Sequence, residues 1–157
     1  LIHVDRSAVI PPHGPAIVLG SEEPKALETA QILAGELNVP VESATEIHEH
    51  DRSNVPHMRS GEFISHVELF FRKPNERVLG RETANEALGR FENAIDDVLA
   101  KHAEGNVAIV SHGTVIALFI EHHSDRSGFA IWREMSLPSF AIFELPEMKL
   151  MELRSRM

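Results

Sequence analysis

Apolar residues along this chain follow two patterns: short continuous runs, and longer stretches in which they recur every three or four positions. The short runs predict strands at about residues 1–4, 16–19, 107–110, 139–143 and 150–153. The periodic stretches predict helices at about 21–37, 61–72, 83–103 and 128–135, with a further helix after residue 112. Strands that alternate with helices in this way are typical of α/β proteins with a mainly parallel sheet.

The residues at the ends of the predicted helices support these boundaries. Ser21 is a candidate N-cap, and Pro24 is tolerated in the first turn of the helix that follows. Thr83-Ala84-Asn85-Glu86 forms a capping box, and Gly105 lies just past the end of the same helix. Residues 40–60 are rich in charged residues, histidine, proline and serine, and we interpret them as a long loop.

Composition narrows the class of protein. The 157 residues are 43% hydrophobic and contain no repeat or linker, so we expect one domain over residues 1–157. The absence of cysteine excludes disulfides and thiolate metal sites. A net charge of −9 argues against binding to nucleic acid. With no bilayer-length apolar run and no leader pattern, we expect a cytoplasmic protein that does not associate with membranes.

The most informative local pattern is Ser111-His112-Gly113, which follows an apolar run and precedes an apolar helical stretch. A strand that turns into a helix at this point places an imidazole at the carboxyl end of the sheet. It also leaves the N–H groups and the positive end of a helix dipole free to hold an anion. We therefore predict a phosphate site here, with Gly113 and Thr114 among its binding residues.

Four stretches, in this order, resemble segments of the histidine phosphatase superfamily, the phosphoglycerate-mutase-like proteins. Residues 19–30 resemble the family's S-S-x-x-x-R-A-x-x-T-A segment, 47–51 its L-x-E segment, 79–83 its G-E-S segment and 111–113 its second-histidine motif. The resemblance implies a three-layer α/β/α sandwich with a mainly parallel central sheet.

The resemblance also implies an activity, that of a metal-independent phosphomonoesterase with a phosphohistidine intermediate and no cofactor. His112 would be the second histidine and Glu49 the proton donor to the leaving group, with Ser21 in the phosphate pocket. Lys25 stands where the family usually has arginine, so it keeps the charge but loses the bidentate fork. A phosphoryl transition state needs such a cationic cradle because it carries heavy negative charge.

The first motif departs from the family pattern, which expects Arg-His-Gly after the first strand. A gap-free alignment places His3 on the arginine and Val4 on the nucleophile, whereas dropping one residue makes His3 the nucleophile. We take His3 as the nucleophile and Arg6 as a substitute cation, partly cancelled by Asp5. The degenerate motif also supports an alternative, an inactive phosphate-binding relative that acts as a sensor or interaction module.

The segment between the first two predicted strands is too short for the family's topology. Parallel strands need a crossover of about a dozen residues or more, usually helical. Residues 5–15 are rich in proline and contain no helical pattern. Either the two strands are not parallel neighbours, or a helical segment is missing between Pro15 and Ala16; of these we favour the omission.

Other residues suggest substrate and metal roles. Residues 52–81 are expected to form a lid that sets substrate choice, and we expect a phosphorylated small-molecule substrate. A homodimer is compatible with the sequence. Residues 48–51 with His57, or the pair His122-His123, contain metal-ligand types, but no third ligand follows at a fixed spacing. We therefore assign no metal site from the sequence.

Overall fold

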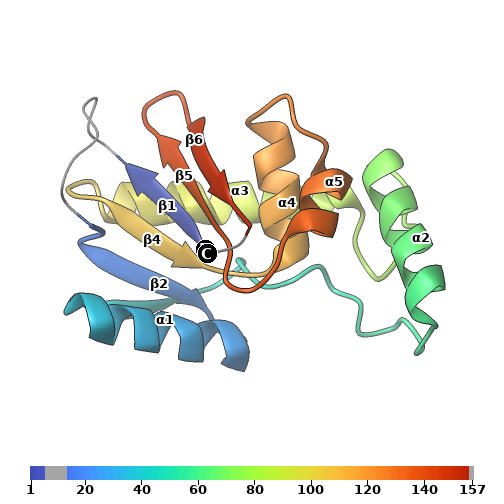
Figure 1. Cartoon of the computed structure of the whole chain (residues 1–157), viewed down its shortest axis with the longest axis horizontal. Coiled ribbons are helices and arrows are strands. Elements are labelled where there is room, and N and C mark those ends of the chain that lie inside the picture. The colour runs from blue at the N-terminus through green and yellow to red at the C-terminus, as the bar shows by residue number, and fades with distance from the viewer. Residues whose placement is uncertain (6–13, 156–157) are drawn as a thin grey trace.

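The computed structural model describes residues 1–5 and 14–155, with side chains at residues 1–2 and 14–155. Its centre is a six-stranded sheet with the order β3-β2-β4-β1-β5-β6 (Figure 1). The strands are β1 (Ile2–Asp5), β2 (Ile17–Ser21), β3 (Val41–Ala44), β4 (Val107–Val110), β5 (Phe140–Glu144) and β6 (Lys149–Arg154).

The sheet contains a parallel block of three strands in which β2 pairs with both β3 and β4. Beyond this block, β1 runs antiparallel to β4 and parallel to β5, and β6 closes the sheet antiparallel to β5. The carboxyl ends of β2, β3 and β4 therefore meet at one edge, where α/β proteins generally place their ligands.

One face of the sheet is covered by α1 (Pro24–Leu37). Val18 of β2 and Val110 of β4 pack with alanines of α1, and Gly20 allows the closest approach. A Cβ at Gly20 would lie 2.7 Å from the Cβ of Ala30, so only glycine fits without displacing the helix.

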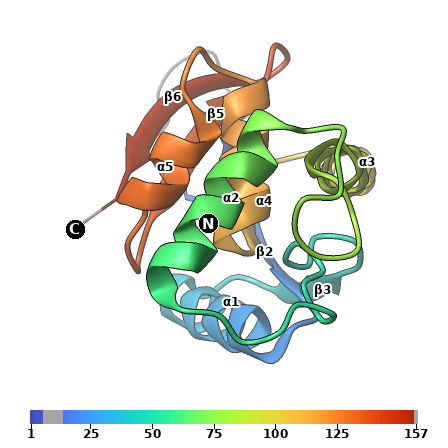
Figure 2. The same cartoon turned by 90° about the vertical axis from the view of Figure 1, so that its right-hand side faces the viewer.

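The opposite face is covered by α3 (Ala84–Lys101) and α4 (Gly113–His122). Helix α4 is apolar all round, and its residues 114–120 are all buried. Helices α2 (Ser60–Arg72) and α5 (Gly128–Glu134) lie beyond the carboxyl ends of β2 and β4 (Figure 1). Figure 2, viewed from that side, shows α2 in front of α4 and α1 along one flank. The three-layer α/β/α architecture expected from the sequence is confirmed.

Two features differ from the sequence prediction. Val41–Ala44 forms β3 inside the predicted loop 40–60. This strand lies at the edge of the sheet and has only four residues, two of them exposed, so it carries little apolar signal. The boundary of α1 also differs, because Ser21 ends β2 while Glu23 is the N-cap and Pro24 begins the helix.

The direction of β1 bears on the short connection to β2. Strand β4 lies between β1 and β2, and β1 runs opposite to both. In the structure the two strands are therefore not parallel neighbours. That a helical segment is missing between Pro15 and Ala16 stays a prediction.

Within the described ranges, none of the helices combines the length and the apolar character needed to cross a bilayer.

Candidate active site

The candidate site lies where β2 and β4 end side by side. Residues 21–23 follow β2, and residues 111–113 follow β4, so the parallel pairing brings the two segments together. His112 is the N-cap of α4 with an extended backbone (φ −119°, ψ 159°). Its side chain makes no capping hydrogen bond, so the imidazole is directed to other partners.

The closest partner of His112 is Glu23. The Nε2 atom of His112 lies 2.9 Å from Oε2 of Glu23. The contact is electrostatic rather than a hydrogen bond, because the ring nitrogen meets the oxygen outside hydrogen-bonding geometry. The same Oε2 accepts a hydrogen bond of 2.7 Å from the backbone N–H of Glu49. A carboxylate oxygen thus lies between an imidazole and a backbone donor, as an oxygen of a bound phosphate would.

Glu49 lies beside the start of α4. One of its oxygens accepts from the N–H of Thr114 at 3.4 Å and lies 3.5 Å from Nη2 of Arg52, and the other accepts from the N–H of His50. The side chain is 21% exposed, so it faces the site while remaining in reach of solvent. The structure therefore places Glu49 and His112 at the same edge, where both contact Glu23, and their catalytic roles stay predictions.

Arg90 of α3 holds the loop that carries Glu49. Its Nη1 donates to the carbonyls of Glu46 (2.6 Å) and His48 (3.2 Å), while Nε and Nη2 donate to the two oxygens of Glu82. Glu82 also accepts from the N–H of Asp51. Burial acts to raise the pKa of Glu82, but hydrogen bonds from Arg90 and Asp51 outweigh it and hold the pKa below its usual value.

The side chain of His50 holds the same loop against the core. It is 2% exposed, its ring packs at a tilt of 33° against Phe70 with centroids 4.2 Å apart, and its Nε2 lies 3.2 Å from the carbonyl oxygen of Glu82. Burial lowers the pKa of His50, so the neutral ring is favoured. Gly80 faces this ring at φ +82°, and a Cβ there would lie 2.2 Å from the carbonyl oxygen of Asp51.

The other predicted pocket residues take varied positions. Ser21 is fully buried at the end of β2, and its Oγ accepts from the N–H of Glu23 at 3.4 Å. Gly113 begins α4, next to His112. Thr114 is buried, and its hydroxyl has no hydrogen-bond partner among the described residues. Lys25 is exposed in the first turn of α1.

Of the two predicted residues of the first motif, the structure describes only the backbone of His3. The backbone of His3 pairs with Ala108 and Ile142, because β1 runs antiparallel to β4. Four residues of chain separate Ala108 from His112, about 13 Å at strand spacing. Arg6 lies outside the described residues, as does the side chain of His3.

Sequence reasoning missed Glu23 and Arg90. Glu23 stands at an unspecified position of the 19–30 segment and Arg90 lies outside all four motif stretches, and both gain their roles from the pairing of distant segments. For the metal candidates, His48, His50 and His57 do not gather into a three-ligand group within the described part of the chain. Such a group forms instead around His122 and His123, outside this site.

A comparison with protein-family models gives a match to the histidine phosphatase superfamily (branch 1) over residues 8–149. No curated protein matches the sequence. The match covers most of the chain and includes all four stretches on which the resemblance rests, together with His112 and Glu49. The chain belongs to the histidine phosphatase superfamily.

Proposed function

We propose that this protein is a phosphomonoesterase that binds the phosphoryl group of its substrate at the start of α4. The observation that supports the proposal is the juxtaposition of His112 and Glu49: Nε2 of His112 and the backbone N–H of Glu49 both contact Oε2 of Glu23, and the Glu49 carboxylate accepts from the N–H of Thr114. An imidazole, the N-terminal end of a helix and a carboxyl group at one edge are parts that phosphoester cleavage can use. Membership in the superfamily supports the same conclusion.

The phosphoryl group would displace the carboxylate of Glu23. One of its oxygens would then approach Nε2 of His112 and accept from the N–H of Glu49, the two contacts that Oε2 of Glu23 now makes. When a histidine nitrogen attacks phosphorus and the P–O ester bond breaks, the leaving oxygen takes a proton from Glu49. Water then attacks phosphorus and gives a proton to Glu49, while the P–N bond breaks with its electron pair returning to the histidine nitrogen, and inorganic phosphate is released.

In this proposal the attacking histidine is His3, which the family resemblance assigns to that role. The assignment requires the ring of His3 to reach the phosphoryl group from a backbone position level with Ala108. Catalysis in this proposal depends on that approach of the His3 ring to phosphorus, and a variant at His3 tests it directly.

The organic part of the substrate fits a cavity beside Gly113. This cavity has a volume of about 280 Å³ and is lined in part by Ser111, Trp132, Met135 and Leu137. An indole and aliphatic side chains at its wall favour a leaving group with apolar surface. We propose a phosphorylated small molecule of this kind as substrate, with hydrolysis preferred over phosphoryl transfer to a second site.

A second candidate is a phosphate-binding relative without turnover. Two observations favour it: the backbone of His3 lies away from the edge, and the anion position holds the carboxylate of Glu23. Such a protein would bind phosphate at His112 and release it unchanged.

Hydrolysis of p-nitrophenyl phosphate across pH 5 to 8, in EDTA, distinguishes these candidates. For a phosphomonoesterase, turnover survives EDTA and falls by about 10²-fold or more in His112→Ala and in His3→Ala, because each removes a group that acts on phosphorus. The matched control His122→Ala changes a half-exposed histidine at the far end of α4 and should retain wild-type turnover.

The remaining outcomes are equally specific. Turnover lost in His112→Ala but retained in His3→Ala would reject His3 as the nucleophile. A folded wild type that binds inorganic phosphate by calorimetry, loses that binding in His112→Ala and shows no turnover would reject the esterase in favour of the binding protein.

A further inference from the structure

Three potential metal ligands converge at the end of α4 that is remote from His112. Glu92 comes from α3, His122 is the last residue of α4, and His123 is its C-cap. Nε2 of His122 lies 3.4 Å from Oε1 of Glu92, and Nε2 of His123 lies 3.2 Å from the same oxygen. One ligand atom from each residue can be chosen such that all three lie within 4.8 Å of one another.

These distances match those around a bound ion. With zinc–ligand bonds of about 2.0–2.1 Å in a tetrahedral site, neighbouring ligand atoms are about 3.3 Å apart. The two imidazole–carboxylate separations already have this value. The remaining separation, between the two imidazoles, can shorten by rotation of His122, whose side chain is 54% exposed.

The surroundings favour a cation at this position. His123 packs on Phe119 with ring centroids 4.5 Å apart, which fixes the imidazole plane. The negative end of the α4 dipole also lies here, because both histidines follow its last turn.

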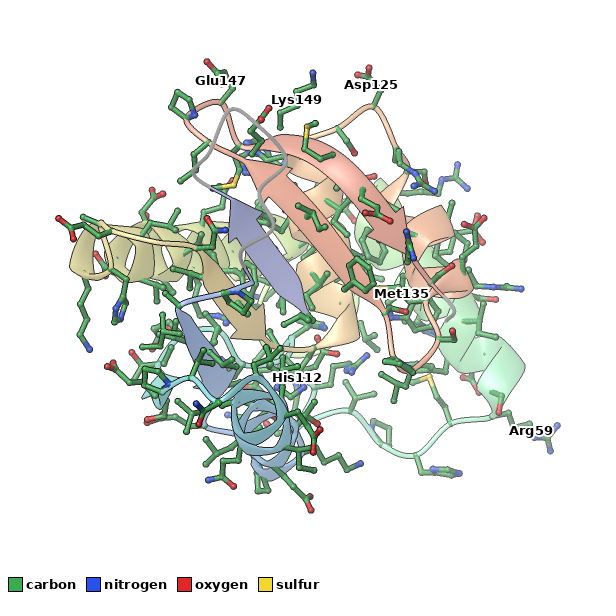
Figure 3. All side chains as sticks on the ribbon, turned by 60° about the vertical axis from the view of Figure 1, so that its left-hand side comes forward. Arg59, His112, Asp125, Met135, Glu147 and Lys149 are labelled. Atoms are coloured by element: carbon green, nitrogen blue, oxygen red, sulfur yellow. The ribbon has the colours of Figure 1, made fainter. Side chains whose placement is uncertain are left out.

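Space for an ion and its water is present next to the histidines. A surface cavity of about 510 Å³ is lined by both of them and by Asp125, Glu147 and Lys149. The two carboxylates of the lining outweigh the single lysine, so the local charge attracts cations. Figure 3 shows Asp125, Glu147 and Lys149 together at one end of the molecule, well away from His112.

We propose that Glu92, His122 and His123 form a binding site for one divalent transition-metal ion, with Zn²⁺ as the best fit. Two imidazoles and a carboxylate are a donor set that Zn²⁺ takes readily, with a water molecule as the fourth ligand. The ion joins α3 to the end of α4. Helix α4 has ten residues, about 15 Å, so the ion is separate from the catalytic groups at His112. The proposal does not rest on the proposed esterase function.

Calorimetric titration of the metal-free protein with ZnCl₂ tests the site. We expect one equivalent to bind, and at least tenfold weaker binding in Glu92→Gln and His122→Asn. Both changes affect partly exposed side chains and preserve approximate shape, so they should leave the fold intact. The matched controls are His57→Asn and Glu104→Gln, at exposed positions outside the cluster, and both should bind Zn²⁺ as the wild type does.

A second measurement links the ion to the fold. Saturating Zn²⁺ should raise the Tm of the wild type by several degrees and leave the Tm of Glu92→Gln unchanged, because only the intact site binds the folded state preferentially. Absence of saturable binding at one equivalent would overturn the proposal. So would unchanged binding in both cluster variants together with a loss in His112→Ala, which would place the ion at the catalytic edge instead.

Discussion

At the scale of single residues, Glu23 sets the charge beside His112. Its carboxylate lies between Nε2 of His112 and the N–H of Glu49, the place that the proposed function gives to phosphate. Under that proposal, phosphate would have to displace a like charge. The neighbouring Glu22 is also exposed but makes neither of these contacts.

We predict that Glu23→Gln tightens the binding of inorganic phosphate by about three- to tenfold. The substitution removes one negative charge about 4 Å from the bound anion, a change of about 1 kcal/mol when solvent screens the pair well. Isothermal titration calorimetry at low ionic strength measures it. The control Glu22→Gln removes the same charge one residue away and should have a smaller effect; equal effects of both variants would mean that Glu23 does not occupy the phosphate position.

The predictable residues of the site were those in local motifs. His112 and Glu49 each stand in a short recognisable string, and the structure brings them together. Glu23 and Arg90 had no such signal. Glu23 reaches His112 only because β2 and β4 are parallel neighbours. Arg90 reaches the loop that carries Glu49 because α3 packs next to that loop. Such contacts between segments that are distant in the sequence cannot be predicted from the spacing of residues.

At the scale of elements, the loop after β3 is positioned by groups that lie far away in the sequence. Arg90 binds its carbonyls, Glu82 binds the N–H of Asp51, and the ring of His50 is buried against Phe70. Gly80 passes so close to this loop that its conformation requires glycine. The position of Glu49 in the site is thus a property of the whole assembly rather than of the loop.

We predict opposite effects for two glycine substitutions on either side of the capping box. Gly80→Ala should lower the free energy of unfolding by about 2 kcal/mol or more, because φ is +82° and the Cβ would meet the carbonyl of Asp51. Gly89→Ala, in the interior of α3 with open space around its Cβ, should raise it by about 0.5–1 kcal/mol. Urea denaturation measures both. Equal effects would contradict the close approach at Gly80.

Most elements followed from periodicity and capping, and the two exceptions have physical causes. The capping box at Thr83 and Glu86 is present as predicted, with both of its hydrogen bonds. Strand β3 was missed because an edge strand of four residues is half exposed and lacks an apolar run. The direction of β1 could not be predicted, since a strand of four residues has the same apolar pattern whichever way it runs.

At the scale of the whole molecule, stability depends in part on keeping the buried His50 and the partly buried His123 neutral. Burial lowers the pKa of His50 and of His123. The unfolded chain therefore binds more protons than the folded one once the pH falls through the unfolded value of about 6.5. The free energy of unfolding therefore decreases as the pH falls below about 6.5, and it is restored as the pH rises above that value.

We predict that the free energy of unfolding falls between pH 7.5 and pH 5.5, and that His50→Gln makes this dependence shallower. A glutamine amide can still donate toward the carbonyl of Glu82 but does not titrate. Urea denaturation at both pH values gives the difference. The control His57→Gln alters an exposed histidine and should keep the wild-type slope; a slope in His50→Gln as steep as in the wild type would exclude His50 as a source.

Helix α4, with residues 114–120 all buried, has a consequence for how the molecule opens. Its amide protons can reach solvent only when α4 separates from the sheet and from the neighbouring helices α3 and α5, which amounts to unfolding of the domain. Hydrogen exchange in this segment should therefore follow global opening, while the loop that carries Glu49 exchanges through local opening. Deuterium exchange, measured on one protein sample, would distinguish local opening of the loop that carries Glu49 from unfolding of the whole domain.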